Sequence, residues 1–281
     1  MRPEVDWLDL CRRIAARQAD LFAATPTIAE RTVYEGRGEG GDMTLALDRS
    51  CEDIVFEELD AVASAGGHCF LAISEERGEL QVGEGEPELR VIIDPIDGSM
   101  NVRRTLPSHS LSIAVAGGDS MADVEFGFVH DFGAREEFAA TRGEGATLNG
   151  HPIAARDARP DTGLEVVGLE SADPRWIVPA IESLQGKAYR VRAIGSIAIT
   201  LSYVAAGRFD AMLSARRCRS VDAAAAQLLV REVGGVVEFA GCELTEAKRG
   251  LDARYAVAGA LDADNLRTVR DAQDAGSASE R

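Results

Sequence analysis

Two stretches near the start of the chain carry apolar residues at the spacing of an amphipathic helix. The first covers residues 4 to about 24 and includes Leu8, Cys11 and Ile14. The second runs from Asp48, which the pattern places as an N-cap, to about Ser64. The sequence therefore predicts that two helices precede the first strand of a sheet.

Short apolar runs in the rest of the first half predict strands. Residues 68–74 and 90–95 form two such runs, and we expect the Gly- and Glu-rich connection between them, 77–89, to be mobile. Between 109 and 141 three β-like runs follow one another across Gly-containing turns, which is typical of an antiparallel meander. The first half therefore has an α+β pattern.

The second half alternates strand-like and helical segments, which is typical of an α/β arrangement. RDARPDTG interrupts the pattern just before this half, so we expect an α+β half over 1–157 and an α/β half over 158–281. The expected strands are 164–169, 189–193, 209–214, 235–239 and 254–260, and the expected helices are 174–184, 196–206, 221–233 and 262–272.

Length and composition exclude several classes of protein. The chain has 281 residues, 46% of them hydrophobic, and its apolar runs fall far short of the roughly 18 residues of a membrane span. We expect no signal peptide and a cytoplasmic location. Five scattered cysteines argue for reduced thiols and against a disulfide framework or a zinc site.

The net charge of −17 excludes some partners and leaves one question open. Nucleic acid and anionic membranes are disfavoured because both bind through lysine and arginine. The acidic surplus fits a solvated surface suited to a salty cytoplasm, an interpretation that the presence of only two lysines favours. It also fits carboxylates that converge on cations, and composition does not separate the two.

The segment VIIDPIDGSMN, residues 91–101, is the strongest candidate for such convergence. We expect the strand to end at Asp94 and the chain to turn at Pro95 and Gly98, which places Asp94 and Asp97 on one side of the turn. Two carboxylates at this spacing suit Mg²⁺, and free N–H groups at the start of a short helix suit a phosphate. The alternative is that Asp-Pro and Asp-Gly are only turn-forming pairs.

Further acidic residues lie where elements begin or end. Glu75 and Glu76 follow an apolar strand, and Asp222 opens a helical run, where it could also serve only as a cap. Another group surrounds a short apolar segment and comprises Asp42, Thr44 and Asp48. Together these positions favour metal-assisted phosphoryl chemistry.

Five blocks of the chain resemble a known family. DPIDGSMN matches the D-P-I-D-G-[S/T]-x-N signature of the inositol monophosphatase-like phosphatases, a superfamily that includes archaeal fructose-1,6-bisphosphatases. The resemblance runs from about Asp42 to Gly259, and its other blocks lie at 74–76, 124–150, 193–213 and 220–237. It implies a layered α/β/α/β/α sandwich with the site between the halves.

The resemblance also implies a set of metal ligands. Glu75, Asp94 and the carbonyl of Ile96 would hold a first Mg²⁺; Asp94, Asp97 and Asp222 would hold a second. A third, weaker ion would share Glu75, and Mn²⁺ is an alternative metal. Glu76 would support Glu75 from behind.

Other positions would act on water and substrate. By the same resemblance Asp48 and Ser99 would help to orient the attacking water, with Glu75 as the third catalytic group. Gly98 and Ser99 would offer amides to the phosphate. Gly195 and Ser196 would add substrate contacts.

The chain departs from the family pattern without losing a ligand. Val221 replaces the usual Trp, Ser74 a Gly and Met100 a Thr. Ala215 stands where animal inositol phosphatases carry a sugar-binding Glu. Beside it lies a basic run, which comprises Arg216, Arg217 and Arg219. This run either binds a second phosphate or only balances nearby acids. Arg190 and Arg192 are weaker candidates for binding a second phosphate.

We therefore expect a Mg²⁺-dependent phosphatase that cleaves a sugar or inositol phosphate monoester with metal-activated water. Fructose 1,6-bisphosphate and inositol 1-phosphate are the expected substrates. The alternatives within the family are a phosphatase of 3'-phosphoadenosine 5'-phosphate or NADP, and a non-catalytic regulatory member. A homodimer is compatible with the resemblance.

Overall fold

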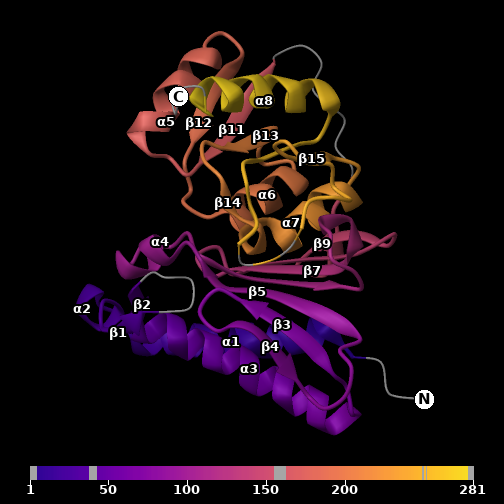
Figure 1. Cartoon of the computed structure of the whole chain (residues 1–281). Helices are drawn as coiled ribbons and strands as arrows, with labels where there is room; N and C mark the ends of the chain where they lie inside the picture. The colour runs from indigo at the N-terminus through magenta and orange to yellow at the C-terminus, as the bar shows by residue number, and fades with distance from the viewer. Residues whose placement is uncertain (1–4, 38–42, 155–162, 249, 251, 278–281) are drawn as a thin grey trace.

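The chain forms five layers that alternate between helices and sheets (Figure 1). The structure is a computed structural model and describes residues 5–37, 43–154, 163–248, 250 and 252–277. From one side to the other lie a helix pair, an eight-stranded sheet, a second helix pair, a five-stranded sheet and a third helix pair. The expected α/β/α/β/α sandwich is confirmed.

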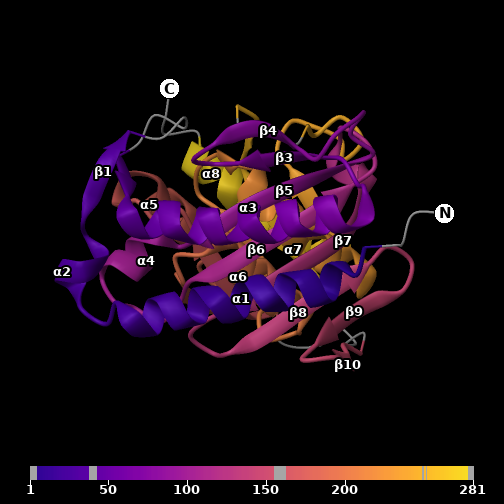
Figure 2. The ribbon, with the colours of Figure 1, turned by 90° about the horizontal axis from the view of Figure 1, so that it is seen from below.

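The eight-stranded sheet follows the order β10-β9-β8-β7-β6-β5-β3-β4, and only β3 and β5 pair in parallel. Helices α1 (Trp7–Ala24) and α3 (Ala46–Gly66) cover its outer face (Figure 2). Its strands are β3 (Phe70–Ser74), β4 (Gly78–Val82), β5 (Leu89–Asp97), β6 (Ser110–Ala116), β7 (Val124–Asp131), β8 (Glu136–Thr141), β9 (Gly145–Leu148) and β10 (His151–Pro152).

The five-stranded sheet follows the order β12-β11-β13-β17-β15, in which β11 runs parallel to β12 and β13. Helices α5 (Pro174–Ser183) and α8 (Ala263–Ser277) lie on its outer face. Its strands are β11 (Leu164–Glu170), β12 (Ala188–Arg192), β13 (Ala211–Ser214), β15 (Val236–Phe239) and β17 (Val257–Ala260).

Helices α6 (Ile197–Ala205) and α7 (Ser220–Glu232) lie between the sheets and are buried on nearly all sides. Residues of both sheets pack against them in the largest core cluster. Small residues allow this close packing, since a Cβ on Gly127 of β7 would lie 2.6 Å from the carbonyl oxygen of Ala225 on α7. The middle layer thus joins the two sheets into one core.

Short elements complete the fold at the edges of the sheets. Two small antiparallel pairs are formed by β1 (Tyr34–Arg37) with β2 (Met43–Leu45), and by β14 (Cys218–Arg219) with β16 (Arg254–Tyr255). The short helices are α2 (Ile28–Arg31), α4 (Ser99–Arg103) and the 3₁₀ turn Met121–Asp123.

Three expectations about the first half are corrected. Helix α3 begins at Ala46 with Leu45 as its N-cap residue, so Asp48 lies in the first turn and is not the cap. The connection 77–89 contains strand β4, an edge strand held by its backbone pairing with β3. Strand β5 continues to Asp97 instead of ending at Asp94, because the chain passes through a bulge.

Two other expectations fall on residues that are not described. Asp42 and the expected boundary between residues 157 and 158 lie outside the described ranges. Within the described residues, no helix is long and apolar enough to cross a membrane.

Candidate metal and phosphate site

A β-bulge brings the two aspartates of the DPID segment to one face of the sheet. Asp94 pairs with Ser112 and Asp97 with Ser110, so β5 has one residue more than β6 over this interval. Ile92 packs in the core of the middle layer, whereas Ile96 packs with residues of α1 and α3 on the opposite face. The extra residue reverses the alternation, and Asp94 and Asp97 both face the middle helices.

Three carboxylates from different elements meet beside this bulge. Glu75 directly follows β3, Asp94 lies on β5 and Asp222 in the first turn of α7, and their oxygens lie within 4.8 Å of one another. Asp94 is 3% exposed. Burial, with Asp97 and Asp222 nearby, raises the pKa of Asp94 well above its ordinary value, and burial raises the pKa of Asp222 to about 7. The raised pKa values indicate that nearby positive charge does not fully offset the negative charge of the three carboxylates.

Asp97 lies outside this three-carboxylate group and is tied to α6. Its Oδ2 accepts hydrogen bonds from the Ser196 hydroxyl and the Ala198 amide, both at 2.6 Å. Burial raises the pKa of Asp97 to about 6, although these hydrogen bonds act to lower it. Asp97 therefore fixes the start of α6 and is also close enough to Asp94 and Asp222 to raise their pKa values.

A cavity of about 590 Å³ opens beside Glu75, a member of the three-carboxylate group. Asp48, Glu75, Glu76 and Ser99 line it, and Glu76 lies near enough to Asp48 to act on its pKa. Asp48 Oδ1 is buried without a hydrogen-bond partner among the described residues. Burial, with Glu76 nearby, raises the pKa of Asp48 to about 6.

The turn after Asp97 is held in a conformation that favours glycine. Gly98 has φ +96°, and a Cβ there would lie 2.9 Å from the carbonyl oxygen of Ser108. The Ser99 hydroxyl donates to the Ile96 carbonyl at 3.2 Å. Asn101, which sequence reasoning did not single out, donates from Nδ2 to the carbonyls of Ser108 and Ile194.

Sequence reasoning also missed Glu170, a buried acid at the end of β11. Its carboxylate accepts hydrogen bonds from the amides of Ile194 and Gly195 at 3.0 and 2.8 Å and from the Thr200 hydroxyl at 2.7 Å. Glu170 thus holds the segment that carries Gly195 and Ser196 against the site. The strand LEVVGLE ends in an acid just as AISEE does, so the same signal could have found it.

The basic run divides between two environments. Arg219, at the N-cap of α7, forms an ion pair with Glu75. Arg216 is exposed, with its guanidinium 5.4 Å from the centre of the Trp176 ring on α5, and Arg217 is exposed as well. Arg190 and Arg192 lie on strand β12 and are exposed. Only Arg219 of the run is thus directly tied to a carboxylate of the site among the described residues.

The donor set of this site suits a hard cation. Every side chain in the group offers carboxylate oxygen, which Mg²⁺ prefers, and several negative charges share a buried space. Arg219 offsets part of this charge, but the raised pKa values and the unpartnered Asp48 Oδ1 indicate that the described side chains do not neutralise all of it. The residues therefore fit divalent cations.

The fold and the site together define a class of protein. Members of this class are α/β sandwiches in which a group of carboxylates and a glycine turn lie where a sheet meets the middle helices. The chain belongs to the inositol monophosphatase family, whose sequence model matches residues 12–274. The expected resemblance is thereby confirmed, and with it membership in a family of phosphatases.

Several curated proteins are similar over most of this chain. A fructose-1,6-bisphosphatase/inositol-1-monophosphatase of Methanothermobacter thermautotrophicus is 33% identical over 80% of this chain and 82% of its own length. The Nus factor SuhB of Escherichia coli is 31% identical over 94% of this chain and 92% of its own length.

Solved structures share the fold. The MJ0109 gene product, described as an inositol monophosphatase-fructose 1,6 bisphosphatase, superposes with a TM-score of 0.81 at 24% identity over 95% of this chain and 100% of that chain. The Thermotoga maritima IMPase gives a TM-score of 0.75 at 24% identity over 98% of this chain and 100% of that chain.

Proposed function

We propose that this protein is a Mg²⁺-dependent phosphatase that hydrolyses a sugar or inositol phosphate monoester. The observation that carries the proposal is the group formed by Glu75, Asp94 and Asp222, whose oxygens lie within 4.8 Å of one another beside an open cavity. Membership in the inositol monophosphatase family supports it. The cavity of about 590 Å³ is of a size that accommodates a sugar phosphate.

The residues of the site divide into three roles under this proposal. Glu75, Asp94, Asp97, Asp222 and the Ile96 carbonyl would hold two to three Mg²⁺ ions, or Mn²⁺. When bound, such ions neutralise phosphoryl oxygens and make water more acidic.

Asp48 and Ser99 line the same cavity and would orient the attacking water. The unpartnered Asp48 Oδ1 is free to accept a hydrogen bond from that water. The amides of Gly98 and Ser99 would bind the phosphate, and the segment of Gly195 and Ser196 would contact the rest of the substrate. Glu76, which also lines this cavity, would act on Asp48 through its charge.

Arg219 is the candidate for a contact with a phosphate oxygen, because it already reaches the carboxylate group. Arg216 and Arg217 are exposed, and Arg216 lies over Trp176. We therefore expect Arg219→Ala to raise KM by about tenfold or more. Arg216→Ala, the matched control, should change KM by less than about twofold. Equal effects of the two substitutions would contradict this assignment.

The deciding experiment measures phosphate release with and without Mg²⁺. The substrates are fructose 1,6-bisphosphate, inositol 1-phosphate, 3'-phosphoadenosine 5'-phosphate and NADP. We expect Asp94→Asn to lower kcat by about a hundredfold or more at unchanged folding, since the lost carboxylate serves charge stabilisation. Asp264→Asn, on an 88% exposed side chain of α8, is the control. No turnover of any of these esters would overturn the proposal.

A regulatory role without catalysis is the second candidate, because relatives named Nus factor SuhB match nearly the whole chain. The same experiment separates the two. Mg²⁺ binding by calorimetry without release of phosphate would favour the regulatory role.

A further inference from the structure

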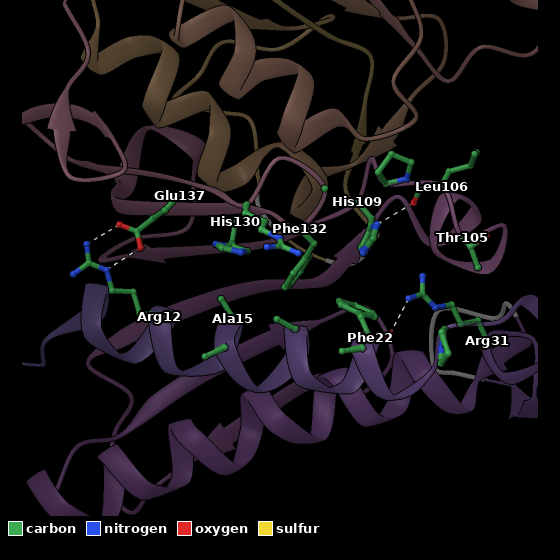
Figure 3. A pocket seen from close by; sticks show the side chains of 17 residues that line it. Arg12, Ala15, Phe22, Arg31, Thr105, Leu106, His109, His130, Phe132 and Glu137 are labelled. Atoms are coloured by element: carbon green, nitrogen blue, oxygen red, sulfur yellow. Dashed lines mark hydrogen bonds and ion pairs between the residues drawn. The ribbon is translucent and has the colours of Figure 1, made fainter.

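A second cavity, of about 760 Å³, lies between α1 and the segments that precede β6 and follow β7 (Figure 3). Exposed alanines of α1, among them Ala16 and Ala19, form part of one wall. Phe22 and Phe132 contribute aromatic rings with centroids 4.8 Å apart. Phe22 also packs against Ile96 and so lies behind the bulge of the candidate active site. The cavity shares no lining residue with the cavity beside Glu75, and Phe22 connects it to Ile96 of the bulge.

His109 brings an unsatisfied polar atom to this cavity. Figure 3 shows its ring pointing toward α1, and the residue is 6% exposed. Nδ1 lies 3.3 Å from the Leu106 carbonyl oxygen and donates to it, which leaves Nε2 as an acceptor. Nε2 is buried without a partner among the described residues. Burial lowers the pKa of His109 to about 4, so the ring is neutral and keeps this acceptor.

The charged residues around the cavity are mainly basic, in a chain of net charge −17. Arg12 pairs with Glu137 through two hydrogen bonds of 2.8 and 2.7 Å, and that pair closes one end. Arg31 is 8% exposed and donates only to main-chain carbonyls. Arg135 is exposed. Within the described residues neither Arg31 nor Arg135 forms an ion pair, so two guanidinium groups remain for an anion.

We propose that this cavity binds a small organic anion with a flat apolar body and a hydrogen-bond donor, such as an anilino-substituted aromatic sulfonate or carboxylate. The aromatic rings of Phe22, Phe132 and His109 would receive the apolar body, and Arg31 and Arg135 would attract the anionic group. A donor on the ligand would reach His109 Nε2 after a small rotation of the ring. The volume lies in the range of small-molecule sites.

The test is calorimetric titration of the full chain with 8-anilinonaphthalene-1-sulfonate, which has an aromatic body, an N–H donor and a sulfonate. Mg²⁺ and inorganic phosphate are present in excess to occupy the candidate active site. We expect one site per chain. Ala19→Trp places a large side chain into the cavity and should weaken binding by about tenfold or more. Ala24→Trp, also on α1 but outside the cavity lining, should stay within about twofold of the unmodified chain.

The charge requirement is tested with the neutral analogue N-phenyl-1-naphthylamine. Arg135→Gln should weaken binding of the sulfonate by about threefold or more and leave the neutral probe unchanged. Ala19→Trp binding the sulfonate as tightly as the unmodified chain would overturn the proposal. So would the absence of probe binding. A dimer, seen by sedimentation velocity, that Ala19→Trp dissociates would then show that a second copy covers this surface.

Discussion

Buried carboxylates of the candidate site work against the stability of the metal-free protein. Burial raises the pKa of Asp97 to about 6 and that of Asp222 to about 7, and burial, with these two acids nearby, raises the pKa of Asp94 well above its ordinary value. Between about pH 4 and 7 the folded chain therefore binds more protons than the unfolded chain, so the free energy of unfolding falls as pH rises. Buried His109, with its pKa lowered to about 4, opposes this trend below about pH 6.5.

We expect this pH dependence to show in thermal unfolding in the presence of EDTA. The acids outnumber the buried histidines, so the melting temperature should fall by several degrees between about pH 5.5 and 7.5. Asp222→Asn should raise the melting temperature at the higher pH and leave it nearly unchanged at the lower pH. The same substitution should lower kcat by about a hundredfold. Asp264→Asn should do neither. A melting temperature that rises with pH in EDTA would contradict the prediction.

The residues of the site were predictable where a local pattern fixes their place. Glu75 and Asp94 stand at or near strand ends, and Asp222 opens a helix, so sequence alone indicated that they could meet. The directions of the basic side chains were not predictable, because composition does not distinguish Arg219, which reaches Glu75, from Arg216, which lies over Trp176. That difference depends on where β14 and α5 lie in the fold.

Four helices begin at the candidate site. Asp48 lies in the first turn of α3, Ser99 begins α4, Asp97 accepts from the first turn of α6, and Asp222 lies in the first turn of α7. The partial positive charge at a helix N-terminus stabilises a nearby anion, so the longer of these helices offset part of the repulsion among the acids. The arrangement of helices thus helps to keep so many acids in one place.

The segment before α6 depends on Glu170, and we expect Glu170→Gln to test that dependence. A glutamine amide would present N–H groups to the Ile194 or Gly195 amide, so one hydrogen bond would be lost. KM should rise by about fivefold or more with a smaller change in kcat, because the carboxylate group itself is intact.

Steady-state kinetics with saturating Mg²⁺ measure this split. Glu165→Gln, an exposed neighbour on the same strand, is the control. A fivefold loss of kcat with KM unchanged would contradict the prediction. It would show that Glu170 acts on the reacting groups and does not position the segment of Gly195 and Ser196.

The order of the larger elements was predictable, but several small ones were not. Alternation and helical spacing indicated the meander of β6, β7 and β8 and the α/β order of the second half. Strand β4 was missed because an exposed edge strand needs only backbone pairing, which Gly- and Glu-rich sequence does not signal. The β5 bulge was missed because it can be recognised only by comparing the number of residues on β5 with the number on its partner β6. The sequence of residues 91–101 alone does not contain that information.

The stability of the whole molecule depends on its middle layer of helices, because α7 packs against both sheets. We expect Gly127→Ala to destabilise the protein by about 2–3 kcal/mol, because the new methyl group would meet the α7 backbone at Ala225. Gly250→Ala, where a Cβ would have open space, is the matched control and should change stability by less than about 0.5 kcal/mol.

Equilibrium unfolding in urea at fixed Mg²⁺ measures both values. A Gly127→Ala protein as stable as the control would mean that β7 and α7 can separate without cost. The middle layer would then not act as a rigid connection between the sheets.

Over the segment from Asp94 to Asp97, the number of residues matters more than their identity. The two acids face the same way only because β5 has one residue more than β6 over this interval. A regular ladder through the same four residues would turn Asp97 toward the layer of α1 and α3. In the descent of this chain, substitutions between these acids can therefore leave the site intact, provided that they keep the bulge.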